Sequence, residues 1–148
     1  MTKSKSREAQ RIAKAHNLGK RDWMNASRVL IPVRVKYMRH WVMMMINMKA
    51  RKFAFYDSLS SRRRGQEVKK DMMQYLKEQV PCLDLTGWQK NGEMVDVPQQ
   101  GAGTVDCGIC MCNFLSCAAE GRKPDIAAEQ VAYMRRRLVL KIANLYAL

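Results

Sequence analysis

The chain has 148 residues, of which 47% are hydrophobic and four are prolines. It is therefore long enough for one domain with a buried core, and extended disorder is excluded over most of its length. Lys and Arg (27) outnumber Asp and Glu (13), so the formal net charge is +14 and the sequence pI is near 9.9. This charge favours anionic partners, namely nucleic acid, an acidic protein surface or an anionic membrane face.

The amino-terminal segment, residues 1–22, is basic and has no apolar core of a secretory signal, so we expect a basic tail. Residues 23–148 are expected to form the folded domain. The longest apolar run, residues 41–46, is too short to span a membrane. The sequence therefore predicts an intracellular protein of the nucleus or cytoplasm, with no membrane partner and with its cysteines as thiols.

Short β-branched and aromatic runs predict strands in the first half of the chain. Residues 29–35 predict one strand, and residues 41–47 and 52–57 predict an antiparallel hairpin joined by a polar turn. The hairpin brings the start of one strand to the end of its neighbour. His40 and Asp57 are therefore expected at the same edge of the sheet.

Helices are predicted after the hairpin. Residues 58–64 indicate a polar, basic loop, and residues 66–80 carry an apolar stripe that predicts a helix ended by Pro81. Two further helices are expected over residues 107–119 and 126–145, the second with its apolar residues, Ile142 among them, facing inward.

Cys107 follows a Gly-rich polar loop and precedes an apolar run, a position where a helix would begin. Free N–H groups and the helix dipole there favour a thiolate over a thiol. A nucleophilic cysteine needs a base and a group that orients the base, which His40 and Asp57 would supply. The Cys107 N–H and the side-chain amide of Gln99 or Gln100 would stabilise an oxyanion. A core cysteine beside an incidental histidine is the alternative that composition alone favours.

A zinc site is a competing interpretation, because four cysteines fall within eleven residues. On one helix, side chains advance by about 100° per residue, so the four sulfurs would not converge on one ion. We therefore expect no metal and no cofactor, and we assign Cys110 and Cys117 to the core. The four are Cys107, Cys110, Cys112 and Cys117.

Four motifs in order resemble the SUMO/ubiquitin-like-protein-specific cysteine peptidases. They are His40-Trp41, the stretch FYDSL at 55–59 with its aspartate seventeen positions after the histidine, PQQ at 98–100, and DCGI at 106–109. The resemblance covers residues 23–148. It implies an α+β, papain-like cysteine protease fold with a small mixed sheet flanked by helices. The family's amino-terminal part, with its Trp-Leu-Asn-Asp-type motif, is not matched, so a truncated, partial catalytic domain is expected.

The resemblance also implies an activity, which is hydrolysis of the peptide or isopeptide bond after the C-terminal Gly-Gly of SUMO or a related ubiquitin-like modifier. Cys107 would be the nucleophile, His40 the general base and then acid, and Asp57 the orienting group. Gln100 would be the oxyanion donor, and Trp41 would line the narrow tunnel that admits the Gly-Gly tail.

Three points stay open at this level. The loop between Gln100 and Asp106 is one residue longer than the family's spacing, which leaves the choice between Gln99 and Gln100 undecided. A catalytically degenerate, basic module that binds an acidic modifier or nucleic acid is the alternative function, and a weak nucleic-acid contact through the basic surface is expected in either case. An acyltransferase would use the same three residues.

Overall fold

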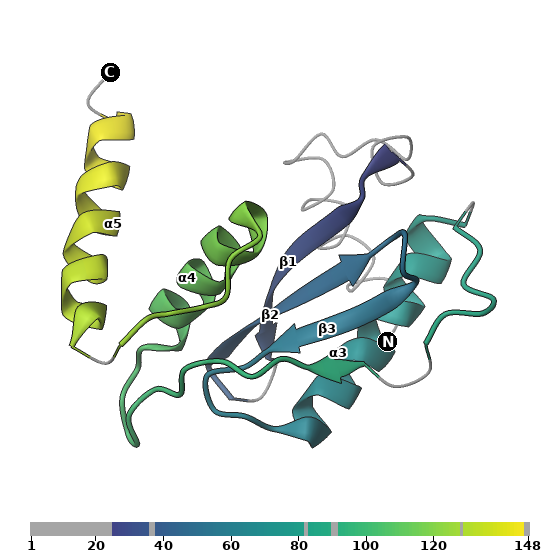
Figure 1. Cartoon of the computed structure of the whole chain (residues 1–148), viewed down its shortest axis with the longest axis horizontal. Helices are drawn as coiled ribbons and strands as arrows, with labels where there is room; N and C mark the ends of the chain where they lie inside the picture. Colours follow the sequence, from purple (N-terminus) through teal and green to yellow (C-terminus); the bar gives the residue numbers. More distant parts are fainter. Residues whose placement is uncertain (1–24, 36–37, 82, 90–91, 128, 147–148) are drawn as a thin grey trace, which may run out of the picture.

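A four-stranded sheet lies between helices in the part of the chain that the structure describes (Figure 1). This computed structural model describes residues 25–35, 38–81, 83–89, 92–127 and 129–146. The elements follow one another as β1 (Arg28–Val35), β2 (His40–Asn47), β3 (Lys52–Tyr56), α3 (Arg62–Gln79), β4 (Glu93–Met94), α4 (Cys107–Glu120) and α5 (Gln130–Tyr146). The predicted α+β class, with a small mixed sheet flanked by helices, is confirmed.

The strands lie in the order β1-β2-β3-β4. The pairs β1–β2 and β2–β3 are antiparallel, whereas the short β4 runs parallel to β3. The predicted hairpin is therefore confirmed, with Asn47 opposite Lys52 and Met43 opposite Tyr56. As a result, the beginning of β2 and the end of β3 share one edge of the sheet, at lower left in Figure 1.

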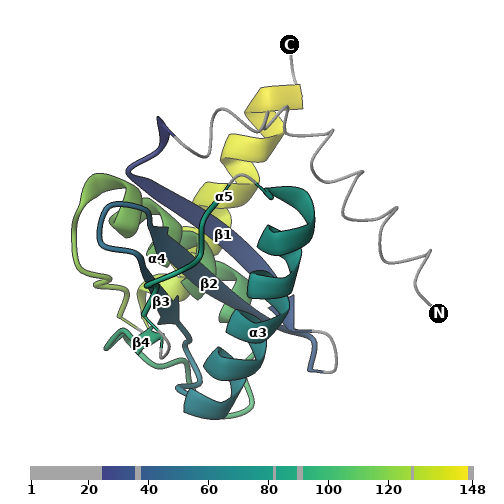
Figure 2. The ribbon, with the colours of Figure 1, turned by 90° about the vertical axis from the view of Figure 1, so that its right-hand side faces the viewer.

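Side chains of β2 and β3 are buried on both faces of the sheet, as expected for central strands. Alternate residues point to opposite faces, so one set packs under α3 and the other under α4 (Figure 2). The α3 cluster includes Val42, Met44, Phe53, Phe55, Val68 and Leu76. The α4 cluster includes Met43, Ala54, Tyr56, Cys110, Met111 and Phe114.

Helix α3 begins earlier than the sequence predicts. The run at 62–64 was expected in a polar loop, but it forms the first turn of the helix. Ser61 caps this turn, because its Oγ accepts a hydrogen bond of 3.2 Å from the Arg64 N–H. Arginine is also a good helix former, so a capped triple-arginine run is stable as a helix. The helix ends at Gln79, shortly before Pro81, as predicted.

Helix α4 begins at Cys107, as predicted, and ends at Glu120. Gly121 follows with φ 71°, the left-handed conformation that glycine adopts at a helix C-terminus without steric cost. The cysteines assigned to the core are buried, with exposed fractions of 2% for Cys110 and 0% for Cys117.

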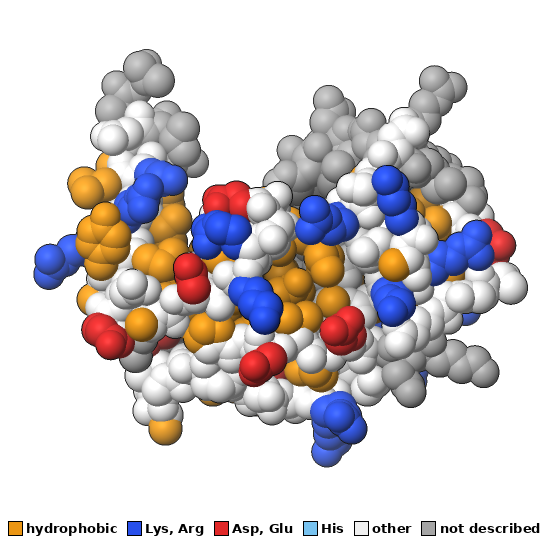
Figure 3. Space-filling model, in the orientation of Figure 1, with side chains coloured by type: hydrophobic (Ala, Val, Ile, Leu, Met, Phe, Trp, Pro, Cys, Tyr) orange, Lys and Arg blue, Asp and Glu red, His pale blue; other side chains and the backbone are white. Residues whose placement is uncertain are grey.

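Helix α5 begins at Gln130, so the expected start at 126 is wrong. Ile126 is buried, but it lies in the loop before the helix. Ile142 was expected to face inward and is 53% exposed, because α5 packs on α4 through its amino-terminal half, with Val131 and Met134. Hydrophobic side chains consequently lie open on α5 among Lys and Arg (Figure 3).

Some expectations fall on residues that the structure does not describe. The tail at 1–22 lies outside the described residues, so the division at residue 22 stays a prediction. Among the described helices, none combines the length and the apolar character that a membrane span requires.

Candidate active site

His40 and Asp57 meet at the shared edge of β2 and β3. His40 is the first residue of β2, and Asp57 directly follows β3. The His40 Nε2–H donates a hydrogen bond of 2.8 Å to Asp57 Oδ1, and each residue is 3% exposed. Because a carboxylate only accepts, this contact places the imidazole hydrogen on Nε2 and leaves Nδ1 as the second functional nitrogen.

Cys107 approaches the same edge from α4. It is the first residue of that helix, it is 8% exposed, and its Sγ lies 3.9 Å from the carbonyl oxygen of Arg39, the residue before His40. The structure thus places the sulfur beside the backbone from which the imidazole projects. The three residues that the sequence nominates as nucleophile, base and orienting group are brought to one corner of the sheet.

The turns that carry His40 and Asp57 contain strained backbone. Arg39 has φ 44° and Ser60 has φ 36°, values in the left-handed region that residues with a Cβ seldom adopt. Such residues cost about 1–3 kcal/mol each, and they concentrate at functional sites. The surrounding hydrogen bonds fix the turns, including that from the Ser60 N–H to the Asp57 carbonyl oxygen at 3.0 Å.

The Asp57 carboxylate accepts two hydrogen bonds on each oxygen. Oδ1 accepts from His40 and from the Leu59 N–H at 2.9 Å, and Oδ2 accepts from the Ser61 N–H at 3.3 Å and from Arg64 Nε at 2.7 Å. Burial alone would raise the pKa of Asp57, but the hydrogen bonds from Arg64, His40 and Leu59 outweigh burial and lower the pKa below its ordinary value. Asp57 is therefore an anion near neutral pH.

Arg64 is a member of this network that reasoning from the sequence missed. It is 8% exposed and lies in the first turn of α3. The signal was available, since Ser61 followed by a run of helix formers marks a helix N-terminus close to Asp57 in sequence.

Gln100 lies where the loop to α4 passes the turn after β3. Its N–H donates to the Ser58 carbonyl oxygen at 3.0 Å, and its side-chain Oε1 accepts 2.6 Å from Ser58 Oγ. Its Nε2 donates to the Thr104 carbonyl oxygen at 3.0 Å. An amide nitrogen carries two hydrogens. This contact uses one of them and leaves the other without a bond to the described residues.

Gln99 is placed differently. It is exposed, and its Nε2 donates both to the Val97 carbonyl oxygen at 2.9 Å and to the Asp57 carbonyl oxygen at 3.3 Å. Both amide hydrogens are therefore engaged with the backbone. This difference favours Gln100 as the oxyanion donor.

Trp41 lies on the open side of the site. It is 37% exposed, and its indole is close to the first turn of α4, since a Cβ added at Gly108 would lie 3.9 Å from Trp41 Cδ1. Gly108 directly follows Cys107. The indole therefore lies beside the turn of α4 that carries Cys107.

Of the other described cysteines, Cys110 and Cys117 are buried in the core, and Cys112 is half-buried. Burial raises the pKa of Cys110, Cys112 and Cys117, and for Cys110 the nearby Asp106 charge adds to this effect. These thiols are consequently protonated near neutral pH. Within the described ranges, no group of three or more His, Cys, Asp and Glu side chains is arranged to hold a metal ion.

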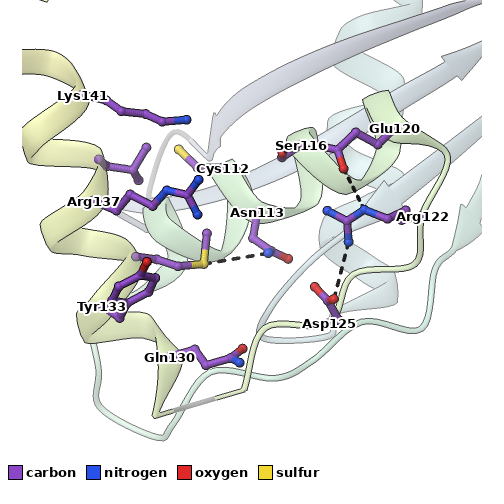
Figure 4. Close-up of a pocket in the computed structure, with 12 residues that line it drawn as sticks. Cys112, Asn113, Ser116, Glu120, Arg122, Asp125, Gln130, Tyr133, Arg137 and Lys141 are labelled. Atoms are coloured by element: carbon purple, nitrogen blue, oxygen red, sulfur yellow. Dashed lines mark hydrogen bonds and ion pairs between the residues drawn. The ribbon is translucent and has the colours of Figure 1, made fainter. Parts of the chain in front are cut away.

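A separate cavity of about 470 Å³ lies between α4 and α5 (Figure 4). Its walls include Cys112, Tyr133 and Arg137, and none of His40, Asp57 or Cys107 lines it. Some charges on its rim pair with one another: Arg122 bonds to Glu120 at 2.7 Å and to Asp125 at 3.4 Å. The candidate catalytic residues therefore lie at the sheet edge and not in this cavity.

A cysteine at a helix N-terminus beside an imidazole that a carboxylate orients is the kind of site found in papain-like cysteine peptidases. Comparison with known proteins agrees with this class. The chain belongs to the Ulp1 protease family, since the model of that family's C-terminal catalytic domain matches residues 1–147. The resemblance seen in the sequence motifs is confirmed.

Two curated relatives illustrate the similarity. A "Sentrin-specific protease" of Caenorhabditis elegans is 31% identical over 121 residues, covering 78% of this chain and 16% of that protein. The "Ubiquitin-like-specific protease 1A" of Arabidopsis thaliana is 28% identical over 129 residues, covering 83% of this chain and 24% of that protein. The chain thus spans about a quarter or less of the length of these two relatives.

Solved structures share the fold. The yeast Ulp1 protease domain, solved in complex with Smt3, the yeast ortholog of SUMO, superposes with a TM-score of 0.65 at 22% identity, covering 86% of this chain and 56% of that one. The Ulp1-like SUMO protease catalytic domain of Chaetomium thermophilum gives a TM-score of 0.64 at 21% identity, covering 87% and 50%. The predicted papain-like fold is confirmed.

Proposed function

We propose that this chain is a cysteine peptidase or isopeptidase that cleaves after the C-terminal Gly-Gly of SUMO or a related ubiquitin-like modifier. The observation that carries the proposal is the 2.8 Å His40–Asp57 pair at the sheet edge where α4 presents Cys107. The names of the relatives and the Smt3 complex of a protein with the same fold support the choice of modifier.

The first half of the reaction forms a thioester. His40 Nδ1 takes the proton of the Cys107 thiol, and the thiolate attacks the carbonyl carbon of the last glycine. Asp57 stabilises the imidazolium and holds the ring through Nε2. The oxyanion accepts hydrogen bonds from the Cys107 N–H and from the free amide hydrogen of Gln100. Imidazolium then protonates the leaving amine as the C–N bond breaks.

The second half releases the modifier. A water molecule gives a proton to His40 and attacks the thioester carbonyl, and the imidazolium returns that proton to the Cys107 sulfur as the C–S bond breaks. The leaving amine of the first half is a lysine ε-amine in a conjugate and an α-amine in a precursor. One site therefore serves both substrates.

Selectivity for Gly-Gly follows from the surroundings of Cys107. The exposed indole of Trp41 beside Gly108 provides a flat apolar wall near the sulfur. Glycine residues have no side chains to clash with such a wall, so a Gly-Gly tail can lie close along the indole, whereas bulkier residues would be held away from it. We assign Trp41 to substrate binding on this basis.

A SUMO with an electrophile in place of its C-terminal carboxylate tests the proposal. We expect a covalent adduct at Cys107, located by peptide mass mapping, and no adduct with Cys107→Ser. The matched control is Cys112→Ser, a thiol on the same helix, which should label like the unmodified chain. Labelling at Cys110 or Cys112, or no labelling, would contradict the proposal.

The alternative is a non-catalytic module whose basic surface binds an acidic modifier or nucleic acid. The net charge of +14 and the exposed arginine run at 135–137 favour it. Binding that falls steeply with salt and is unchanged by Cys107→Ala, together with absence of the adduct, would establish this alternative. A location in the nucleus or cytoplasm accompanies either function as a proposal.

A further inference from the structure

Arg64 is buried against the one carboxylate of the candidate site. Its side chain is 9% exposed, its Nε donates 2.7 Å to Asp57 Oδ2, and its Nη1 lies 3.3 Å from Met38 Sδ. Arginine is seldom buried to this extent unless a partner compensates its charge. The mechanism proposed above uses Cys107, His40, Asp57 and Gln100, and it assigns no role to this guanidinium.

We propose that Arg64 is a positioning residue of the peptidase site: it fixes the Oδ2 oxygen of Asp57 and so holds Oδ1 against His40. The inference rests on the proposed function and adds a fourth side chain to it. Arg64 touches neither the sulfur nor a substrate, so it acts through Asp57.

The two oxygens of the Asp57 carboxylate bind different partners. Oδ1 serves His40 and the Leu59 N–H, whereas Oδ2 serves Arg64 and the Ser61 N–H. A carboxylate held on both oxygens cannot rotate about its terminal bond without losing a charge-assisted hydrogen bond. The imidazole that it orients is then fixed as well.

The local fold sets the position of Arg64. The Ser61 hydroxyl caps α3 by accepting a hydrogen bond of 3.2 Å from the Arg64 N–H. The Ser61 N–H in turn donates to Asp57. The cap therefore joins the start of the helix to the turn after β3. An arginine at the third position of the helix reaches back to the aspartate with little freedom.

The charge of Arg64 has a second effect. The titratable and charged side chains that face Asp57 are His40 from β2 and Arg64 from α3, with Cys107 of α4 next to the same corner. Burial raises the pKa of Asp57, and the hydrogen bond from Arg64 is the main influence that lowers it. Without the guanidinium, Asp57 would take up a proton at a higher pH, and the imidazolium would lose its counter-charge there.

The test is the rate at which iodoacetamide alkylates Cys107, followed by mass mapping of the Cys107 peptide from about pH 4.5 to about pH 9. This readout needs no modifier. The full chain is compared with Arg64→Met, Arg64→Lys and Arg62→Met, a matched control because Arg62 is exposed in the same turn. Cleavage of a fluorogenic SUMO C-terminal substrate is measured over the same range.

For Arg64→Met we expect the acidic limb of both profiles to move to higher pH. The rate relative to the unmodified chain should therefore fall by roughly tenfold or more further at the acid end than at neutral pH. Arg64→Lys keeps the charge and should retain the acidic limb, with a lower rate at every pH because lysine lacks the planar fork. Arg62→Met should match the unmodified chain.

A loss by the same factor at every pH in Arg64→Met would overturn the inference, because a merely structural role predicts that result. If Arg64→Met does not fold, Arg64→Gln takes its place, because it keeps a hydrogen-bond donor but not the charge, and an unshifted acidic limb in that variant would equally overturn the inference. The two proposals can fail separately. If the alkylation profiles of the variants behave as expected but the unmodified chain does not cleave the SUMO substrate, the proposed function is refuted and the role of Arg64 remains.

Discussion

Two arginine–aspartate pairs flank the candidate site, and they differ in burial more than in distance. On the α3 side, Arg64 bonds to Asp57 at 2.7 Å, with side chains 9% and 3% exposed. On the α5 side, Arg135 bonds to Asp106 at 2.5 Å, with side chains 49% and 20% exposed. One aspartate orients His40 and the other precedes Cys107. Distance alone would rank the exposed pair as the stronger, but solvent screening makes it much weaker.

The surroundings of the two pairs explain the difference. The α3 side closes over the aromatic cluster of the sheet, and each oxygen of Asp57 has two donors. On the other side, α5 extends beyond the core and exposes apolar residues such as Tyr133, Val139 and Leu140 (Figure 3). The α3 side is thus a rigid half of the site, and the α5 side is a solvated half.

Asp57→Asn is the most damaging test of the rigid half. It leaves Arg64 buried without a counter-charge, so we expect the free energy of unfolding to fall by about 3–5 kcal/mol. The loss of the anion that stabilises the imidazolium should lower kcat/KM by about a thousandfold or more. Urea unfolding and cleavage of a SUMO C-terminal substrate measure the two effects.

The double variant Asp57→Asn/Arg64→Met separates these effects. It removes both charges together, so most of the lost stability should return, whereas activity should stay as low as in the single variant. If the single variant were as stable as the unmodified chain, the pair would not be buried in the way that the structure describes.

Acid provides a second test of the buried pair. The folded pKa of Asp57 is lowered relative to the unfolded chain, so the ionised carboxylate stabilises the fold fully above the unfolded value of about 4. That contribution is lost as the pH falls through the folded value. We therefore expect the stability difference between the unmodified chain and Asp57→Asn to shrink by at most about 1 kcal/mol between about pH 7 and about pH 3, because only the part of this window below the unfolded value contributes. Urea titrations measure it, and a constant difference would contradict the cause assigned here.

The sequence predicts the catalytic corner better than it predicts the supports of that corner. The hairpin that unites His40 with Asp57 follows from strand period and turn length, and the start of α4 at Cys107 follows from the loop before it. Both are local signals. The burial of Arg64 depends on the cap at Ser61, which a basic run obscures, since such runs usually mark solvated loops.

For the carboxy-terminal helix, α5, the sequence predicts the helix but not how much of its apolar face is buried. A continuous apolar stripe predicts a fully packed face, but Ile142 lies beyond the length of α4 that α5 contacts and stays exposed. The 29-residue separation between Asp106 and Arg135 likewise has no local signal. Periodicity identifies an apolar face, whereas only the tertiary arrangement decides how much of it is covered.

Ser58→Ala tests how far the rigid half extends toward the oxyanion donor. The Ser58 hydroxyl, 1% exposed, donates to Gln100 Oε1 and so sets which end of the amide faces outward. Without it the amide can flip, and we expect kcat/KM to fall by about tenfold with a smaller change in KM. In Gln100→Ala the added Ser58→Ala change should have little further effect. Gln99→Ala is the control, and a loss there as large as in Gln100→Ala would reverse the assignment of the donor.

Arg135→Ala should have the smallest effect on stability and reactivity, because the ion pair between Arg135 and Asp106 is partly exposed to solvent. We expect less than about 1 kcal/mol of lost stability and no more than a few-fold change in the rate of Cys107 alkylation. Salt distinguishes this pair from the buried one: the effect of Arg135→Ala should largely disappear between about 0.05 M and about 1 M NaCl, whereas that of Arg64→Met should persist. Arg136→Ala, on the same exposed turn, controls for the loss of one positive charge. A salt-resistant loss in Arg135→Ala comparable to that of Arg64→Met would mean that α5 holds Cys107 as firmly as α3 holds Asp57, and the contrast between a rigid and a solvated half would no longer stand.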